Sequence, residues 1–101
     1  MTQQIAVITP PTVMTSDAVL DSIRNLLPIE AQHWLTTAGN NGTRNTTIVN
    51  DNNTFTVTTQ WSDAEALAGY KTVMAGASSD IANAIESDGW TMTLTPLTAD
   101  L

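Results

Sequence analysis

Cysteine is absent from this chain of 101 residues. Its absence excludes disulfides, thiolate metal sites and cysteine nucleophiles. The sequence also has no long apolar run, and its start, MTQQIAVITPP, has neither the basic region of a signal peptide nor a membrane-spanning stretch. We therefore expect a cytoplasmic protein built as one domain over residues 1–101, because a chain of this length can bury a single core without crosslinks.

Basic side chains are scarce. Arg24, Arg44 and Lys71 stand against ten acidic residues, and the formal net charge is −7. Nucleic-acid binding relies on clustered basic groups that displace counterions from phosphates, and three scattered ones do not supply such a patch. The negative charge also disfavours anionic membranes. We expect neither nucleic acid nor a membrane as a partner.

Four segments have the pattern of β-strands. Residues 3–9 are apolar on both faces at their centre, which favours a strand covered on both sides. Residues 43–49 and 54–61 flank NDNN, and these side chains tolerate left-handed backbone, so the two segments predict a hairpin. The last segment, WTMTLTPL, alternates apolar residues with threonine until Pro96 ends it.

The first helical region begins after the first strand. Thr15, Ser16 and Asp17 are all candidate N-caps for it. Pro28 either kinks one long helix or occupies the first turn of a second, shorter one. We favour the second alternative, with Gly39 ending the short helix.

The second helical region follows residues 54–61. Ser62 and Glu65 have the spacing of a capping box, in which a serine caps the helix and a glutamate reaches back to it. The helical pattern is interrupted near Gly76 and resumes at Ser78 or Ser79. Asp88-Gly89 then ends it.

The order of elements is therefore β-α-β-β-α-β. With right-handed crossovers, this order folds most simply into a four-stranded antiparallel sheet of strand order 4-1-3-2 with the helices on one face. The sequence thus predicts an α+β protein with the ferredoxin-like fold.

One face of the predicted sheet consists almost entirely of threonine. The residues expected to pack under the helices are Phe55, Val57, Trp61, Trp90, Met92 and Leu94. The residues expected on the opposite, open face are Thr54, Thr56, Thr58, Gln60, Thr91, Thr93 and Thr95. Because the first strand adds apolar side chains at the centre of this face, and no lysine or glutamate guards the third and fourth strands, the pattern favours burial against a second copy over solvation. Two such faces would form a homodimer with an isologous interface.

The segment TQWSDAEALAGY, residues 59–70, carries a resemblance to a known family. A strand that ends in a tryptophan, followed by an acidic, alanine-rich helix, is similar to the antibiotic-biosynthesis-monooxygenase type of domain in the dimeric α+β barrel superfamily. The resemblance implies two subunits packed sheet to sheet and, in some members, a pocket between sheet and helices. Some members oxidise phenolic substrates without a bound cofactor, and others degrade haem. We carry over the fold and the dimer, and expect no cofactor.

Few side chains are candidates for chemistry. His33 is the weak catalytic candidate, as a general base or metal ligand, but a lone histidine lacks the partners for either role, which favours a surface position. Trp61, Tyr70 and Trp34 could line a cavity for a flat ligand, with Tyr70 donating a hydrogen bond, or could be core residues, which is the more common case. We expect no metal site.

The acidic residues have a structural explanation. Residues 17 and 21, and residues 63 and 65, lie at predicted helix starts, where carboxylates complement the helix dipole.

Two hypotheses about the function remain open. One is a dimer that binds a small aromatic ligand between sheet and helices; alternatively, such a dimer is a cofactor-independent monooxygenase-like enzyme. The other is a structural or interaction module without catalysis.

Overall fold

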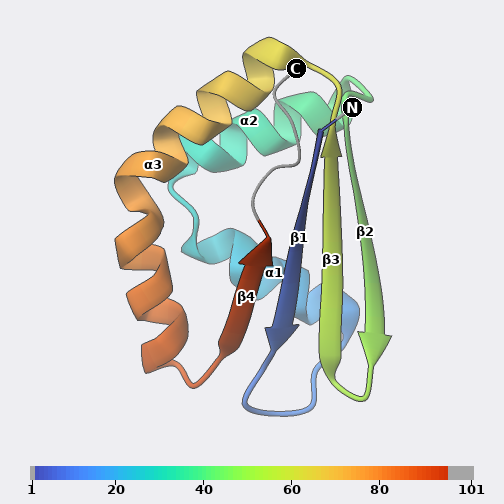
Figure 1. Cartoon of the computed structure of the whole chain (residues 1–101), viewed down its shortest axis with the longest axis vertical. Helices are drawn as coiled ribbons and strands as arrows, with labels where there is room; N and C mark the ends of the chain where they lie inside the picture. Colours follow the sequence, from blue (N-terminus) through green and yellow to red (C-terminus); the bar gives the residue numbers. More distant parts are fainter. Residues whose placement is uncertain (1, 96–101) are drawn as a thin grey trace.

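A computed structural model describes residues 2–95 as an α+β protein (Figure 1). Its elements are β1 (Thr2–Thr9), α1 (Ser16–Leu26), α2 (Ile29–Asn40), β2 (Arg44–Asp51), β3 (Thr54–Trp61), α3 (Ala64–Ser87) and β4 (Thr91–Thr95). All strand pairs are antiparallel, and the four strands lie in the order β2-β3-β1-β4. This is the predicted order 4-1-3-2 read from the other edge, so the predicted ferredoxin-like sheet topology is confirmed.

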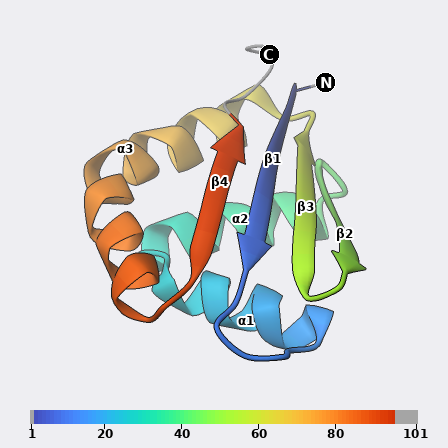
Figure 2. The same ribbon diagram turned by 60° about the horizontal axis from the view of Figure 1, so that its bottom comes forward.

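The helices form one layer against the sheet. Figures 1 and 2 show α1 and α2 on the same face of the sheet, with α3 crossing α2 and then descending beside β4. The closest packing of α3 is against α2 rather than against any strand. No helix within residues 2–95 covers the opposite face of the sheet.

The core divides into two clusters at opposite ends of β3. Trp61, the last residue of β3, packs with the buried Ala38, Ala66 and Leu67 from α2 and α3. Phe55, near the start of β3, packs with Ile8 and Val19. Because side chains in a strand alternate between faces, these two aromatic residues lie on the same, helix-covered face.

The β2–β3 turn confirms the predicted hairpin. Asn52 and Asn53 both have positive φ angles, 50° and 67°, as a tight two-residue turn between twisted strands requires. Asn53 also fixes the turn to the β1–α1 loop: its side-chain oxygen accepts from the Met14 backbone N–H at 3.0 Å, and its amide nitrogen donates to the Thr12 carbonyl at 2.9 Å. β2 itself runs over Arg44–Asp51 rather than the predicted residues 43–49.

Pro28 separates two helices, as expected. Thr15 is the N-cap of α1, and its hydroxyl accepts from the Ala18 backbone N–H at 3.2 Å. The predicted end of α2 at Gly39 is wrong, because α2 continues to Asn40 and the left-handed residue is Gly42, with φ 73°. Gly39 remains helical and serves packing instead: a Cβ there would lie 2.5 Å from Nη2 of Arg44.

The start of α3 differs from the prediction. Asp63, not Ser62, is the N-cap, and its carboxylate accepts from the backbone N–H groups of Glu65 and Ala66 at 3.0 and 3.1 Å. Ser62 is engaged elsewhere, since its backbone N–H donates to the Thr43 carbonyl at 2.9 Å and extends the β2–β3 pairing. The capping box from Ser62 to Glu65 is therefore not formed.

The predicted interruption at Gly76 is also wrong. α3 is one helix of 24 residues, which changes direction midway in Figure 1 and ends before Gly89, a residue with φ 82°. A glycine inside a helix costs only about 1 kcal/mol relative to alanine. Beyond Gly76, the buried Ile81 and Ile85 anchor the helix to the core. The predicted end at Asp88-Gly89 is confirmed, whereas Pro96 lies outside the described residues.

The helix-free face has the predicted composition. Strand register places the following side chains on it: Gln3, Ile5, Val7, Thr9, Asn45, Thr47, Val49, Asp51, Thr54, Thr56, Thr58, Gln60, Thr91, Thr93 and Thr95. We call this set the open face. Its only charged residue is Asp51, at the end of the edge strand β2. Leu94 lies on the other face, as predicted, but is 50% exposed because it belongs to the edge strand β4.

Candidate functional site

Three of the four candidate site residues meet in one aromatic cluster. Trp34 from α2 and Tyr70 from α3 pack against Trp61, which is 1% exposed. The rings of Trp61 and Tyr70 lie 5.1 Å apart at 35° to each other. Through these contacts the three side chains hold α2 and α3 against the end of β3.

Trp34 lies directly on the backbone of α3. A Cβ on Gly69 would lie 2.2 Å from Cε2 and 2.4 Å from Cζ2 of the Trp34 indole, far inside van der Waals contact. Only glycine leaves room for this approach. The aromatic cluster thus depends on the pairing of one tryptophan in α2 with one glycine in α3.

Arg44 borders the aromatic cluster on the β2 side. Its Nε donates to the Leu35 carbonyl at 2.8 Å, and its Nη1 donates to Oγ1 of Thr46 at 2.7 Å. Burial lowers the pKa of Arg44, the positive charge of Arg24 lowers it further, and Tyr70 acts in the opposite direction. Burial in turn raises the pKa of the Tyr70 phenol, and nearby Arg44 partly offsets that effect. Tyr70 is therefore a neutral hydrogen-bonding group at physiological pH.

His33 is not part of the cluster. It is exposed on α2, and its ring meets the edge of Trp34 at a centroid distance of 5.9 Å and an angle of 65°. Within residues 2–95, no group of three or more histidine and carboxylate side chains is placed to hold a metal ion.

The carboxylates at helix starts act locally. Asp63 caps α3, and Glu65 lies in its first turn. Asp17 lies in the first turn of α1, whereas Asp21 follows in the same helix. Each carboxylate in a first turn complements the positive end of the helix dipole.

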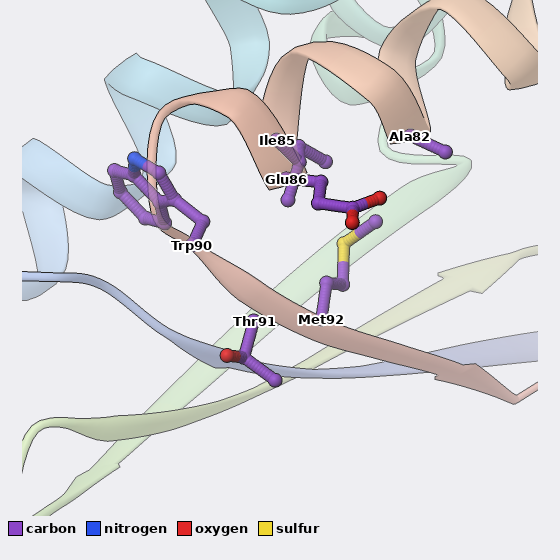
Figure 3. Close-up of a pocket in the computed structure, with 6 residues that line it drawn as sticks. All are labelled: Ala82, Ile85, Glu86, Trp90, Thr91 and Met92. Carbon is purple, nitrogen blue, oxygen red and sulfur yellow. The ribbon is translucent and has the colours of Figure 1, made fainter.

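An open groove lies between α3 and β4. It has a volume of about 380 Å³ and is lined by Ala82, Ile85, Glu86, Trp90, Thr91 and Met92. Figure 3 shows the Glu86 side chain extending from the helix and the Met92 side chain extending from the strand into the space between them. The groove is mainly apolar, with one carboxylate at its wall.

None of the groove residues was a candidate from the sequence. Trp90 and Met92 were expected to pack under the helices, and both do contact the cluster around Phe55. The groove exists because α3 is continuous and runs past the edge strand β4, whereas the sequence pattern predicted a break at Gly76. The alternation in WTMTLTPL was the only sequence feature that concerned these residues. It predicts which side chains share a face of the sheet and does not predict a cavity.

Comparison of the chain with family models, with curated proteins and with solved structures found no match. The family resemblance therefore stays a prediction, supported at the level of sheet topology. None of the described helices combines the length and the apolar character that a bilayer crossing needs.

Proposed function

We propose that the protein is a homodimer that binds a small aromatic ligand between sheet and helices, in the groove formed by α3 and β4. The observation that carries this proposal is the groove itself. Ligand sites typically have volumes of roughly 300–1,000 Å³ and apolar walls with a few polar groups. The groove, at about 380 Å³, has that size and composition.

The lining side chains favour a flat ligand with a hydrogen-bond donor. Trp90 offers an aromatic surface, and Met92 offers a polarisable sulfur that contacts aromatic rings favourably. Glu86 offers carboxylate oxygens, which accept a hydrogen bond from a phenolic hydroxyl. A phenol with one or two fused rings meets these requirements.

Filling the groove tests the proposal. Ala82 is exposed and lines the groove, so Ala82→Phe should occupy the ligand volume with little effect on folding. We expect 2-naphthol, or another member of a panel of phenols and quinones, to bind the native protein saturably by calorimetry, and Ala82→Phe to weaken it about tenfold or more. Ala75→Phe, at an exposed position of α3 outside the groove, is the matched control. Equal affinities for both variants, or no binding from the whole panel, would contradict the groove as the site.

The open face supports the dimer. Ile5 and Val7 on the inner strand β1 form an apolar centre, with Val7 38% exposed, and Val49 on the edge strand β2 adds an apolar side chain that is 63% exposed. Threonine surrounds them, and the face lacks the lysines that usually protect exposed strands from pairing. A second copy presents the same surface, so a two-fold interface would bury apolar side chains of both copies.

A lysine at the centre of the open face should separate the subunits. We expect the native protein at micromolar concentration to scatter light with twice the mass of a 10.8 kDa chain. Val7→Lys should weaken dimerisation about tenfold or more, because it introduces two like charges into the interface. Val13→Lys makes the same change at a residue that is 91% exposed and lies outside the sheet, and should leave the mass unchanged. A native protein of single-chain mass would refute the dimer.

The monooxygenase alternative stays a prediction. Of the residues that line the groove, Glu86 alone carries a carboxylate, the group that would act as a general base toward a phenol. His33, the other candidate base, is exposed on α2.

A further inference from the structure

Two of the three basic residues of this acidic chain converge at the β2 edge of the sheet. Arg24, at the end of α1, donates to Oγ1 of Thr36, and Arg44, the first residue of β2, donates to the carbonyl of Leu35. Both guanidinium groups thus bind to consecutive residues of α2. They lie close enough for the charge of Arg24 to act on Arg44.

The described residues offer these arginines only neutral partners. Their hydrogen bonds go to Oγ1 of Thr36, Oγ1 of Thr46 and the Leu35 carbonyl, and no carboxylate from residues 2–95 pairs with them. The chain carries ten acidic residues, so carboxylates are not scarce. Arg44 is half-buried and Arg24 is exposed, so their like charges repel each other, and an anion bound between them would relieve that repulsion.

We propose that Arg24 and Arg44 bind a small multivalent oxyanion, phosphate or a polycarboxylate, at the β2 edge of the sheet. Arginine is suited to this role because its planar guanidinium carries five N–H donors. Arg44 uses Nε and Nη1 within the protein and Arg24 uses Nη2, which leaves further N–H groups of both side chains for oxyanion oxygens. Arg24 is exposed, so an anion reaches the pair from solvent. The site lies at the edge opposite to the α3–β4 groove and is independent of the ligand proposed there.

The two threonines complete the donor set. The hydroxyl oxygens of Thr36 and Thr46 accept bonds from the arginines, which leaves each O–H proton available to donate. A bound oxyanion would then meet guanidinium and hydroxyl donors from α1, α2 and β2. The arrangement also accounts for Gly39, whose missing side chain lets Nη2 of Arg44 lie against α2.

Thermal unfolding in phosphate, citrate and chloride at equal ionic strength tests the site. We expect phosphate or citrate to raise the melting temperature at low concentration and saturably, because a ligand that binds the folded state acts by mass action at a finite site, whereas exclusion of these salts from the protein surface stabilises without saturation. Chloride should not have this effect. The anion that acts identifies the chemistry, phosphate or carboxylate. In NMR titrations, the largest shifts should fall on the Thr36 and Arg44 amides.

Three variants connect the effect to the arginine pair. Arg24→Gln should weaken anion binding about tenfold or more, and Arg44→Lys, which keeps the charge but loses the fork, should also weaken it. Lys71→Gln removes one positive charge from α3 instead and should retain native affinity. The proposal is overturned if phosphate and citrate act no more strongly than chloride, or if Lys71→Gln loses as much affinity as Arg24→Gln.

Discussion

Replacing Trp61 with alanine should cost about 3–5 kcal/mol of the free energy of unfolding, the usual range for a large aromatic residue removed from a core. Trp61 is 1% exposed and contacts residues of α2 and α3 from the end of β3. Its loss leaves a cavity that Ala38, Ala66 and Leu67 cannot fill, and it removes the ring partner of Tyr70. Domains of this size are stable by only about 5–15 kcal/mol, so the variant should retain a small part of its stability or unfold.

Chemical denaturation followed by circular dichroism measures this loss. Trp61→Phe retains an aromatic ring and should lose less than Trp61→Ala. Val13→Ala, at a position that is 91% exposed, should stay within about 0.5 kcal/mol of the native protein. A Trp61→Ala variant that loses no more stability than Val13→Ala would show that the aromatic cluster is not a core.

Replacing two glycines of α3 with alanine should change the free energy of unfolding in opposite directions. Gly69→Ala places a methyl group 2.2 Å from the Trp34 indole and should destabilise the protein by about 2 kcal/mol or more, because the rigid ring must leave its place. No atom lies within 4 Å of a Cβ on Gly76. Gly76→Ala should therefore stabilise the protein by up to about 1 kcal/mol, the difference in helix propensity between glycine and alanine.

The comparison has an internal control, since both substitutions add one methyl group to the same helix. A second control replaces the ring: in a Trp34→Leu background, Gly69→Ala should be nearly neutral, and the double-mutant cycle gives the coupling energy between the two positions. The urea midpoint of each variant is the measurement. If Gly69→Ala and Gly76→Ala stabilise the protein equally, Trp34 does not lie in close contact with Gly69 of α3.

The strands and their faces could be read from the sequence because they depend on local alternation. In residues 54–61, the apolar Phe55, Val57 and Trp61 share one face with Thr59, the other face carries only threonine and glutamine, and β3 has the predicted bounds. The turn at Asn52 and Asn53 was visible for a similar reason, since asparagine is one of the few residues that adopts left-handed backbone at low cost. The open face followed from the same alternation.

The helix ends were predicted less well. Ser62 and Asp63 are both good N-cap residues. Asp63 caps α3, because the backbone of Ser62 is hydrogen-bonded to Thr43 across the sheet. Gly39 and Gly76 looked like stop signals, yet each lies inside a helix. At Gly39 the reason is the guanidinium of Arg44, which no local pattern reveals.

The proximity of three candidate residues agrees with the structure, while their role in binding a ligand stays a prediction. Trp34, Trp61 and Tyr70 do lie together, because helical and strand spacing directs them to the covered face of the sheet. The groove lies between the consecutive elements α3 and β4, but it depends on α3 continuing past Gly76, which the sequence pattern did not indicate. The approach of Arg24 to Arg44 depends on how α1 and β2 pack against α2, so spacing alone could not predict it.

The sequence by itself determined the strand pattern, the hairpin, the division at Pro28 and the threonine-rich open face, since each follows from side-chain alternation or from the backbone preference of one residue. Only the tertiary structure decided that α2 and α3 continue through Gly39 and Gly76, which residue caps α3, and which side chains meet at the groove and at the arginine pair. The physical reason is one of magnitude. Most helix propensities differ by up to about 1 kcal/mol per residue, whereas burial of one large apolar side chain is worth about 1.5–3 kcal/mol, so long-range packing overrides local signals wherever the two disagree.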